Sequence, residues 1–169
     1  MARVYLGLGT NLGNKEQNLR DAIQKIGERI GEIISLSVFY ITSPWGFTSK
    51  NDFFNAALCA DSSLLPLEIL KETQIIEYKM GRISKSADKV YQDRLIDIDL
   101  LLYDNLIMNT ETLILPHPLM TERVFVMKPL AEIAPKIIHP ILGKTIEDIF
   151  HSIKNQEYAL HPETWTVNI

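Results

Sequence analysis

The chain has 169 residues, of which 46% are hydrophobic and 22% are charged, as in an ordinary globular protein. Its 17 basic and 21 acidic residues give a formal net charge of -4, which argues against a general nucleic-acid binder with a strongly basic face. The single cysteine, Cys59, excludes a disulfide within the chain and fits a reducing compartment. No leader precedes the first strand and no apolar run is long enough to span a membrane, so we expect one cytoplasmic domain over residues 1–169.

The first third of the chain shows strand and helix patterns in turn. Residues 4–9 predict a strand, Asn14 begins a helix as part of a capping box, and Gly31 ends that helix. Residues 33–40 predict the second strand. The glycines within residues 7–13 do not have dinucleotide-binding spacing, and we interpret them as room for close packing and a turn.

Residues 42–52 predict an exposed loop that carries Trp45, a ring that is costly to leave in water. The third predicted strand covers residues 53–60 and places Asn55 among apolar neighbours. An amide in such a position needs partners, because burying it unpaired costs about 1–3 kcal/mol. Asn55 either caps a neighbouring loop or binds the donor–acceptor edge of a heterocycle stacked on Phe53.

The second predicted helix runs from Pro66 to Met80 and has Gln74 and Glu77 on one polar flank, for which a solvated face is the plain interpretation. Residues 82–92 then form a long charged loop. The loop is either solvated or, together with Arg94, supplies the cations that a polyphosphate requires.

The segment at residues 93–103 predicts a strand with two carboxylates on one face. Alternation places Asp97, Asp99, Leu101 and Tyr103 on that face and Ile96, Ile98, Leu100 and Leu102 on the other. Neighbouring like charges are costly unless they reach water, pair with Arg94, or share a divalent cation that prefers oxygen ligands. The basic residues nearby favour a metal site.

The second half of the chain predicts a hairpin and two helices. Its expected elements are short strands at residues 106–108 and 113–115, His117 between two prolines, a helix from Thr121 that is interrupted at Pro129, a helix at residues 145–153, and a polar tail at residues 155–169 that docks, if anywhere, at a sheet edge. The element order predicts an α+β, ferredoxin-like βαββαβ core: an antiparallel sheet with helices packed on one face, followed by the C-terminal hairpin and helices.

No Walker-type glycine loop occurs, so arginines, lysines and metal must hold any phosphate. Residues 94–103, Arg-Leu-Ile-Asp-Ile-Asp-Leu-Leu-Leu-Tyr, closely resemble the signature of the 6-hydroxymethyl-7,8-dihydropterin pyrophosphokinase family of folate biosynthesis. The resemblance covers most of the chain in register, through residues 6–13, 37–46, 53–57, 77–82, 115–118, 123 and 129–130.

The resemblance implies Mg²⁺-dependent transfer of pyrophosphate from ATP to the hydroxymethyl pterin, giving AMP. It implies that Asp97 and Asp99 bind two Mg²⁺ ions and that Arg82 and Arg94 assist the transfer. The pterin side would comprise Thr42, Pro44, Trp45, Phe53, Asn55 and Phe125. The ATP side would comprise Gln74, Glu77, Arg82, Arg94, Ile98, His117 and Arg123. The implied partners are these two small molecules, without nucleic acid or membrane, and the implied enzyme is a monomer. The family pattern is not kept at Ser84, Tyr91, Thr112 and Pro118.

Two other functions suit parts of the same pattern. Another metal-dependent nucleotidyl or phosphoryl transferase would use paired aspartates on a ferredoxin-like sheet, but it would not need Trp45, Phe53 and Asn55 together. An RNA-binding module of this topology would need exposed aromatic residues in a basic field, which the net charge disfavours.

Overall fold

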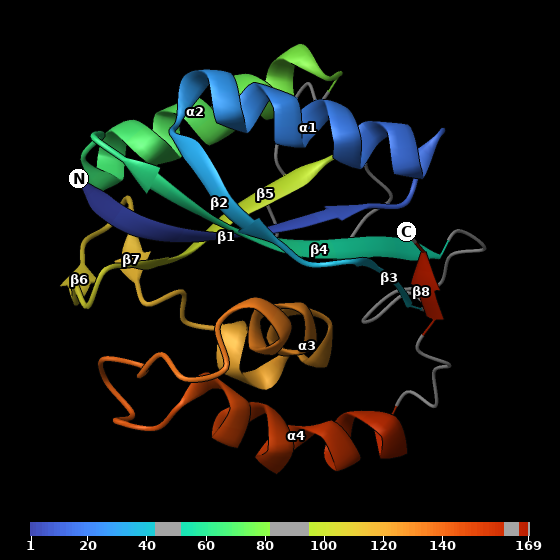
Figure 1. The fold of residues 1–169 in the computed structure, drawn as a ribbon, viewed down its shortest axis with the longest axis vertical. Helices are drawn as coiled ribbons and strands as arrows, with labels where there is room; N and C mark the ends of the chain where they lie inside the picture. Colours follow the sequence, from blue (N-terminus) through green and yellow to red (C-terminus); the bar gives the residue numbers. More distant parts are fainter. Residues whose placement is uncertain (43–51, 82–94, 161–165, 169) are drawn as a thin grey trace.

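The computed structural model has a central sheet that is covered by helices on both faces (Figure 1). Helices α1 (Lys15–Arg29) and α2 (Pro66–Lys79) cover one face, while α3 (Val124–Ile133) lies on the other face with α4 (Ile146–Leu160) packed outside it. None of the described helices is long and apolar enough to cross a membrane. The residues that the structure describes are 1–42, 52–81, 95–160 and 166–168, with side chains up to residue 154.

The sheet has the strand order β5-β1-β4-β3-β8, and β2 also pairs with β4. Its strands are β1 (Ala2–Thr10), β2 (Glu32–Leu36), β3 (Phe39–Thr42), β4 (Phe53–Ser62), β5 (Asp97–Tyr103) and β8 (Thr166–Asn168). All pairings are antiparallel. This arrangement confirms the predicted ferredoxin-like core, but the second pair of helices makes it a sheet covered on both faces rather than one.

The strand predicted at residues 33–40 is in fact two strands, β2 and β3, which follow one another along β4. The break lies at Ser37 and Val38. The Ser37 hydroxyl accepts the Ala57 N–H at 2.9 Å, and the Val38 N–H is donated to the Glu132 carboxylate at 3.1 Å. Side chains therefore take over positions of the backbone ladder, which the alternation of residue types does not reveal.

Strand β5 contains a β-bulge that changes which side chains share a face. Tyr5 pairs with Leu102, whereas the next residue, Leu6, pairs with Leu100, so Leu101 is an extra residue on β5. A bulge of this kind inverts the alternation of side chains beyond it.

The bulge makes the predicted face wrong for Leu102 and Tyr103. Leu102 is buried on the α3 side, and the Tyr103 hydroxyl donates to the Leu64 carbonyl at 2.9 Å on the α2 side. Asp97 and Asp99 precede the bulge and are half-buried between residues that pack in the α1–α2 core. They therefore face α3 together, as alternation predicts.

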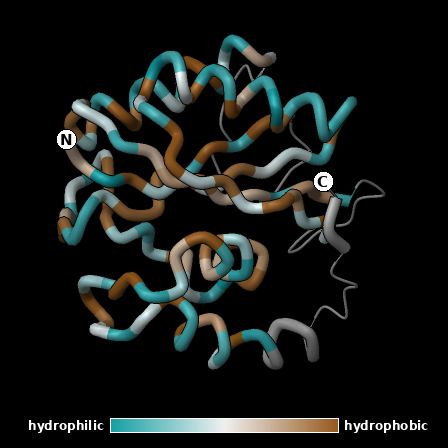
Figure 2. Tube along the Cα trace, in the orientation of Figure 1, coloured by the Kyte–Doolittle hydropathy of each residue, from teal (hydrophilic) through white to brown (hydrophobic). Residues whose placement is uncertain are grey.

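Each face of the sheet has its own hydrophobic core, and Figure 2 shows the apolar residues along the strands with hydrophilic residues on the outer helices. The α1–α2 core includes Leu6, Leu19, Ile26, Leu58, Ile69, Ile76, Ile96 and Ile98. The α3–α4 core includes Tyr5, Ala57, Cys59, Leu101, Met127, Leu130 and Ile146. Cys59 is a buried free thiol whose pKa is raised by burial, as expected for a small hydrophobic residue.

The hairpin predicted in the second half is confirmed as β6 (Met108–Asn109) and β7 (Ile114–Leu115). A 3₁₀ turn, Met120–Glu122, leads into α3, which continues through Pro129. The predicted interruption at Pro129 is therefore wrong. Pro129 removes only the hydrogen bond that the Phe125 carbonyl would accept, and burial of Met127, Pro129 and Leu130 holds the helix together.

The predicted last helix and tail also need correction. The helix predicted at residues 145–153 is present, but α4 runs from Ile146 to Leu160 and so continues beyond the predicted end. Strand β8 pairs with β3, which confirms docking at a sheet edge. The tail's Trp165 lies outside the described residues.

The end of α1 is packed so closely on β4 that Gly31 cannot carry a side chain. A Cβ at Gly31 would lie 2.1 Å from the Asp61 carbonyl oxygen. We expect Gly31→Ala to lower the free energy of unfolding by about 1–3 kcal/mol or more, measured by urea denaturation. Gly27→Ala is the matched control, because its Cβ would make ordinary contact 3.7 Å from Ile33 and should stabilise α1 by about 0.5–1 kcal/mol. Equal stability of the two variants would contradict the described packing.

His139 gives the loop before α4 a pH-dependent stability. Its buried Nδ1 accepts the backbone N–H groups of Ile141 at 3.3 Å and Leu142 at 3.1 Å, and burial lowers its pKa below the usual 6.5. A lowered pKa means that the unfolded chain binds the proton more readily, so stability is complete above pH 6.5 and is lost as the pH falls below it.

We expect the free energy of unfolding to drop more in the native chain than in His139→Asn when the pH is lowered from about 7.5 to about 5. Asparagine retains an acceptor oxygen but does not titrate. Urea denaturation at both pH values measures the difference, and identical pH dependence in the two proteins would rule out His139 as its source.

Candidate active site

A row of three paired residues crosses the sheet on the α3 side. Gly9 of β1 pairs with Asn55 of β4 on one side and with Asp97 of β5 on the other. Residues paired directly across antiparallel strands project to the same face. Asn55 and Asp97 therefore face α3 with no side chain between them.

A second row lies two residues along β1. Gly7 pairs with Ala57 and with Asp99, so Asp99 is beside Asp97 on the same face. Both glycines and both aspartates are half-exposed, whereas Tyr5, Cys59 and Leu101 of the same face are buried. The helical layer thus covers one part of this face and leaves the part with the carboxylates accessible.

The donor set of Asp97 and Asp99 fits Mg²⁺ that is bound together with a phosphate. Within the described residues, no group of three or more His, Cys, Asp or Glu side chains could hold a metal by itself. Mg²⁺ is usually held by one or two carboxylates while water and substrate phosphates supply the other oxygens. Two accessible carboxylates on one face meet that requirement, and a closed protein-only metal cage is not needed.

Asn55 is held in place by the neighbouring strand. Its side-chain nitrogen donates to the Thr42 hydroxyl at 3.0 Å, and the two residues are only 5% and 4% exposed. Phe53 pairs with Thr42 and is half-exposed. The structure therefore brings together three of the residues predicted for the pterin side.

Arg123 and Phe125 lie at the beginning of α3. Arg123 occupies the N-cap position, and its guanidinium carbon is 5.8 Å from the centre of the Phe125 ring. Both side chains are half-exposed, and α3 packs on β4 and β3. They are thus on the same side of the sheet as Asn55 and Asp97.

Glu77 is not on a solvated flank, which corrects the plain interpretation of the sequence. It is 2% exposed, and its carboxylate accepts the Ile98 N–H at 3.0 Å, where the outer edge of β5 meets α2. Gln74 of the same helix is exposed. The Ile98 side chain lies in the α1–α2 core, so the structure does not bring it to the face of the carboxylates.

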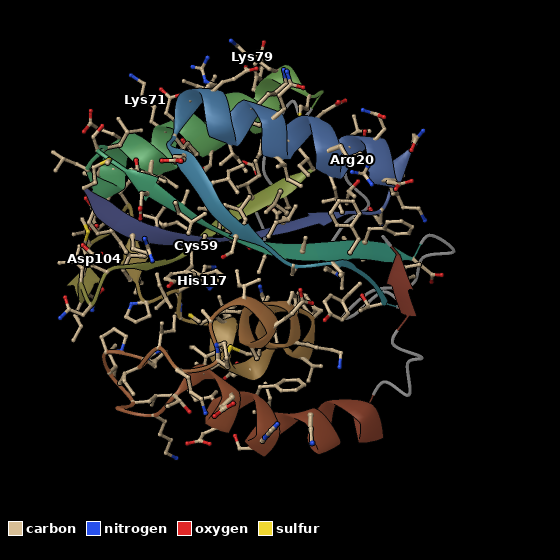
Figure 3. The ribbon with its side chains drawn as sticks, viewed as in Figure 1. Arg20, Cys59, Lys71, Lys79, Asp104 and His117 are labelled. Carbon is tan, nitrogen blue, oxygen red and sulfur yellow. The ribbon has the colours of Figure 1, made fainter. Side chains whose placement is uncertain are left out.

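His117 is attached to the bulge of β5 and lies on the α3 side of the sheet (Figure 3). Its N–H donates to the Leu101 carbonyl at 2.9 Å, and its ring Nδ1 accepts the Leu119 N–H at 3.2 Å. The neutral ring therefore carries its proton on Nε2, which is suited to donate to a phosphate oxygen.

Several predicted site residues lie outside the described residues: Pro44, Trp45, Arg82 and Arg94, together with Ser84 and Tyr91. Gly81 and Leu95, the described residues that border the range 82–94, are close together. A Cβ at Gly81 would be only 2.7 Å from the Leu95 side chain. The chain thus leaves α2 and returns toward Asp97 at neighbouring points.

Glu132, which no sequence motif singles out, links α3 to β3. Its carboxylate accepts the Tyr40 hydroxyl at 2.5 Å and the Val38 N–H at 3.1 Å. Burial and the hydrogen bond to Glu132 raise the pKa of Tyr40. Lys128 lies over the Tyr40 ring at 5.7 Å. An acidic residue in a predominantly apolar helix is the one signal of such a link in the sequence.

Comparison with known families matches residues 5–135 to 7,8-dihydro-6-hydroxymethylpterin-pyrophosphokinase (HPPK). A 2-amino-4-hydroxy-6-hydroxymethyldihydropteridine pyrophosphokinase of Porphyromonas gingivalis is 46% identical over 141 residues, which are 83% of this chain and 95% of that protein. The enzyme of the same name from Aquifex aeolicus is 40% identical over 148 residues, covering 88% and 90% of the two chains. The chain belongs to the 7,8-dihydro-6-hydroxymethylpterin-pyrophosphokinase family.

Larger proteins contain the same fold as one part. The chain is 38% identical to the folic acid synthesis protein fol1 of Pneumocystis carinii over 154 residues, but it spans only 20% of that protein. The crystal structure of Plasmodium falciparum HPPK-DHPS with pteroate matches with a TM-score of 0.74 and 14% identity, over 94% of this chain and 45% of that one. That likeness establishes the fold.

The link between Glu132 and Tyr40 is testable by a double-mutant cycle. We expect Tyr40→Phe and Glu132→Ala each to lower the free energy of unfolding, with a coupling energy of about 1 kcal/mol, because one hydrogen bond is lost in both. Urea denaturation of the four proteins measures it. The exposed pair Lys136–Glu147 is the control and should show a far smaller coupling. Additive effects of Tyr40→Phe and Glu132→Ala would show that the contact does not hold α3 to β3.

Proposed function

We propose how the residues of this chain carry out the reaction of its family. That reaction, a step of folate biosynthesis, transfers pyrophosphate from ATP to 6-hydroxymethyl-7,8-dihydropterin and releases AMP, and the chain is a transferase of this type. The observation that carries the proposal is the row in which Asn55, Gly9 and Asp97 lie side by side across the sheet. This row supports the proposal because it puts an amide, proposed to bind the ring, and a carboxylate, proposed to act at the phosphates, on one face of the sheet.

Asp97 and Asp99 would hold two Mg²⁺ ions, which neutralise charge on the ATP phosphates when bound. Their accessible carboxylates are what supports this role. Arg82 and Arg94 would assist by contacting the transferred group, since a guanidinium binds two phosphate oxygens at once. Arg123 and the Nε2–H of His117 would donate to other oxygens of the nucleotide.

The pterin would bind beside Asn55. Thr42 keeps the Asn55 amide in one orientation, so that the amide can pair with the edge of the heterocycle. Phe53 and Phe125 would stack on its two faces, and Pro44 and Trp45 would complete the enclosure. Aromatic pairs of this kind add about 0.5–1.5 kcal/mol beyond the area that they bury.

Gln74, Glu77 and Ile98 would act at the nucleotide side near the outer edge of β5. Because the Ile98 side chain is buried in the other core, its contribution would come from the backbone. The contact between Glu77 and the Ile98 N–H fixes β5 against α2 and so holds the neighbouring Asp97 and Asp99 in place.

The transfer forms a bond between the hydroxymethyl oxygen and the β-phosphorus, and breaks the bond from that phosphorus to the oxygen bridging the α-phosphorus. The hydroxyl loses its proton and AMP leaves with the bridging oxygen. Positioning of the two substrates and neutralisation of charge supply most of the acceleration in such reactions, so no strong general base is required.

We also propose that residues 1–169 form one pyrophosphokinase domain that works as a monomer in the cytoplasm. The two hydrophobic cores share one sheet, which supports a single domain. The single buried thiol of Cys59 is compatible with a reducing compartment.

The carboxylate pair is tested by Asp97→Ala, assayed with Mg²⁺, ATP and 6-hydroxymethyl-7,8-dihydropterin. We expect AMP formation to fall by at least about a hundredfold, because charge stabilisation at the phosphates is lost. Asp148→Ala on exposed α4 is the control and should retain full activity. Thermal unfolding verifies that both variants are folded, and undiminished AMP formation by Asp97→Ala would overturn the proposed role.

A further inference from the structure

The row of site residues continues one strand beyond Asn55. On the side away from Gly9, Asn55 pairs directly with Tyr40 of β3. Directly paired residues project to the same face, so Tyr40 also faces α3 and is the next member of the row. Tyr40 is only 7% exposed. A group that fixes Tyr40 therefore acts on the strand that also supplies Thr42, the hydrogen-bond partner of the Asn55 amide.

Glu132 of α3 holds β3 through both of its carboxylate oxygens. Oε1 accepts the Tyr40 hydroxyl at 2.5 Å, and Oε2 accepts the Val38 N–H at 3.1 Å. One bond at each oxygen fixes the orientation of the carboxylate, and hydrogen bonds to a charged acceptor are stronger than those between neutral groups. Val38 is the residue before β3 and Tyr40 is the second residue of that strand, so Glu132 binds the beginning of β3.

The contact with Tyr40 also fixes how α3 is rotated about its own axis. Phe125, Lys128 and Glu132 follow one another at helical spacing, so their side chains lie along one side of α3. The Lys128 side-chain nitrogen lies 5.7 Å from the centre of the Tyr40 ring, which places this side of the helix against β3. Phe125 is two turns before Glu132, about 10 Å along the axis. A rotation of α3 that carried Phe125 away from β3 would also separate Glu132 from Tyr40.

We propose that Glu132 is a positioning residue for the ring-binding side of the site: by holding Tyr40, it fixes Phe125 of α3 relative to the row that contains Asn55. The inference rests on the proposed function. Glu132 and Tyr40 would not touch the pterin. They would act through Phe125 on one face of the ring and, through β3, on the bonded pair of Thr42 and Asn55.

The nucleotide side depends less on this link. The carboxylates of Asp97 and Asp99 belong to β5, which is separated from β3 by two strands. Of the described residues assigned to the nucleotide, Arg123 at the N-cap is the one that belongs to α3. Loss of the Glu132 carboxylate should therefore weaken binding of the pterin more than binding of the nucleotide.

The test compares Glu132→Ala with the conservative variant Glu132→Gln. Binding of 6-hydroxymethyl-7,8-dihydropterin is measured by calorimetry in the presence of Mg²⁺ and a non-hydrolysable ATP analogue, and binding of the analogue is measured separately. For Glu132→Ala we expect the Kd of the pterin to rise at least about tenfold, because a small displacement of a substrate-contacting group is costly, and the Kd of the analogue to stay within about threefold. Glu132→Gln should stay within about threefold for both ligands, because its amide oxygen still accepts the Tyr40 hydroxyl.

Two control variants separate positioning from a general loss of stability. Ile26→Val removes a methyl group from the α1–α2 core on the opposite face of the sheet and also lowers stability, but it should leave the pterin Kd unchanged. Glu147→Ala removes a carboxylate from the exposed pair with Lys136 and should leave the pterin Kd unchanged as well. Thermal unfolding shows whether each variant is folded at the temperature of the measurement.

Unchanged pterin affinity in folded Glu132→Ala would overturn the proposal. Equal losses of pterin and analogue affinity in that variant would also overturn it, because the link would then support the whole site without preference for the ring. An equal rise of the pterin Kd in Ile26→Val would overturn it too, since a loss of stability alone would then explain the effect.

Tyr40→Phe keeps the proposal testable if Glu132→Ala does not fold. This variant keeps the ring in the row and removes only the hydroxyl. We expect its pterin Kd to rise by about threefold to tenfold, because one hydrogen bond is lost while the bond from Val38 to Glu132 remains. Unchanged pterin affinity in Tyr40→Phe would likewise overturn the proposal. Failure of the proposed function is distinguishable, because the unaltered chain would then bind no pterin, and the positioning role would fall with it.

Discussion

The pairing of β1 with both β4 and β5 is the constraint on which the rest of this site depends. Because β1 is the middle strand of the three, one register brings together residues 9, 55 and 97, which are far apart along the chain. A shift of one residue in either pairing would turn a site side chain to the opposite face. The hydrophobic cores on both faces oppose such a shift, since each alternating set of side chains is buried.

The helical layers give the two ends of the sheet face different roles. Helix α3 buries Tyr5, Cys59 and Leu101, and it leaves Gly7, Gly9 and the two aspartates accessible. Arg123 at its N-cap and Phe125 in its first turn lie at one end, while Glu132 near the other end accepts hydrogen bonds from Tyr40 of β3 and from Val38. The hydrogen bonds of Glu132 thus connect β3, which carries Thr42, to α3, which carries Phe125. The two sides of the proposed ring site are therefore held relative to one another.

Local patterns in the sequence succeeded where one local rule decides the outcome. The Asn14 side chain accepts the Gln17 N–H at 3.1 Å and caps α1 as predicted, although the Gln17 side chain donates to Asp21 and does not complete the capping box. Two-residue alternation places Asp97 and Asp99 together. Predictions failed where a distant contact changed the local rule. The bulge at Leu101 puts Tyr103 on the face opposite to the predicted one. Glu77 is buried, and not solvated, because its carboxylate accepts the Ile98 N–H at the outer edge of β5.

The amino-acid sequence by itself determined the order of strands and helices, the paired carboxylates, and the family to which their motif belongs, because these follow from residue type and short-range spacing. The tertiary structure decided which strands are neighbours, where β5 bulges, and that a glycine separates Asn55 from Asp97. Register between strands depends on the simultaneous burial of both faces, a property of the assembled sheet that no single segment contains.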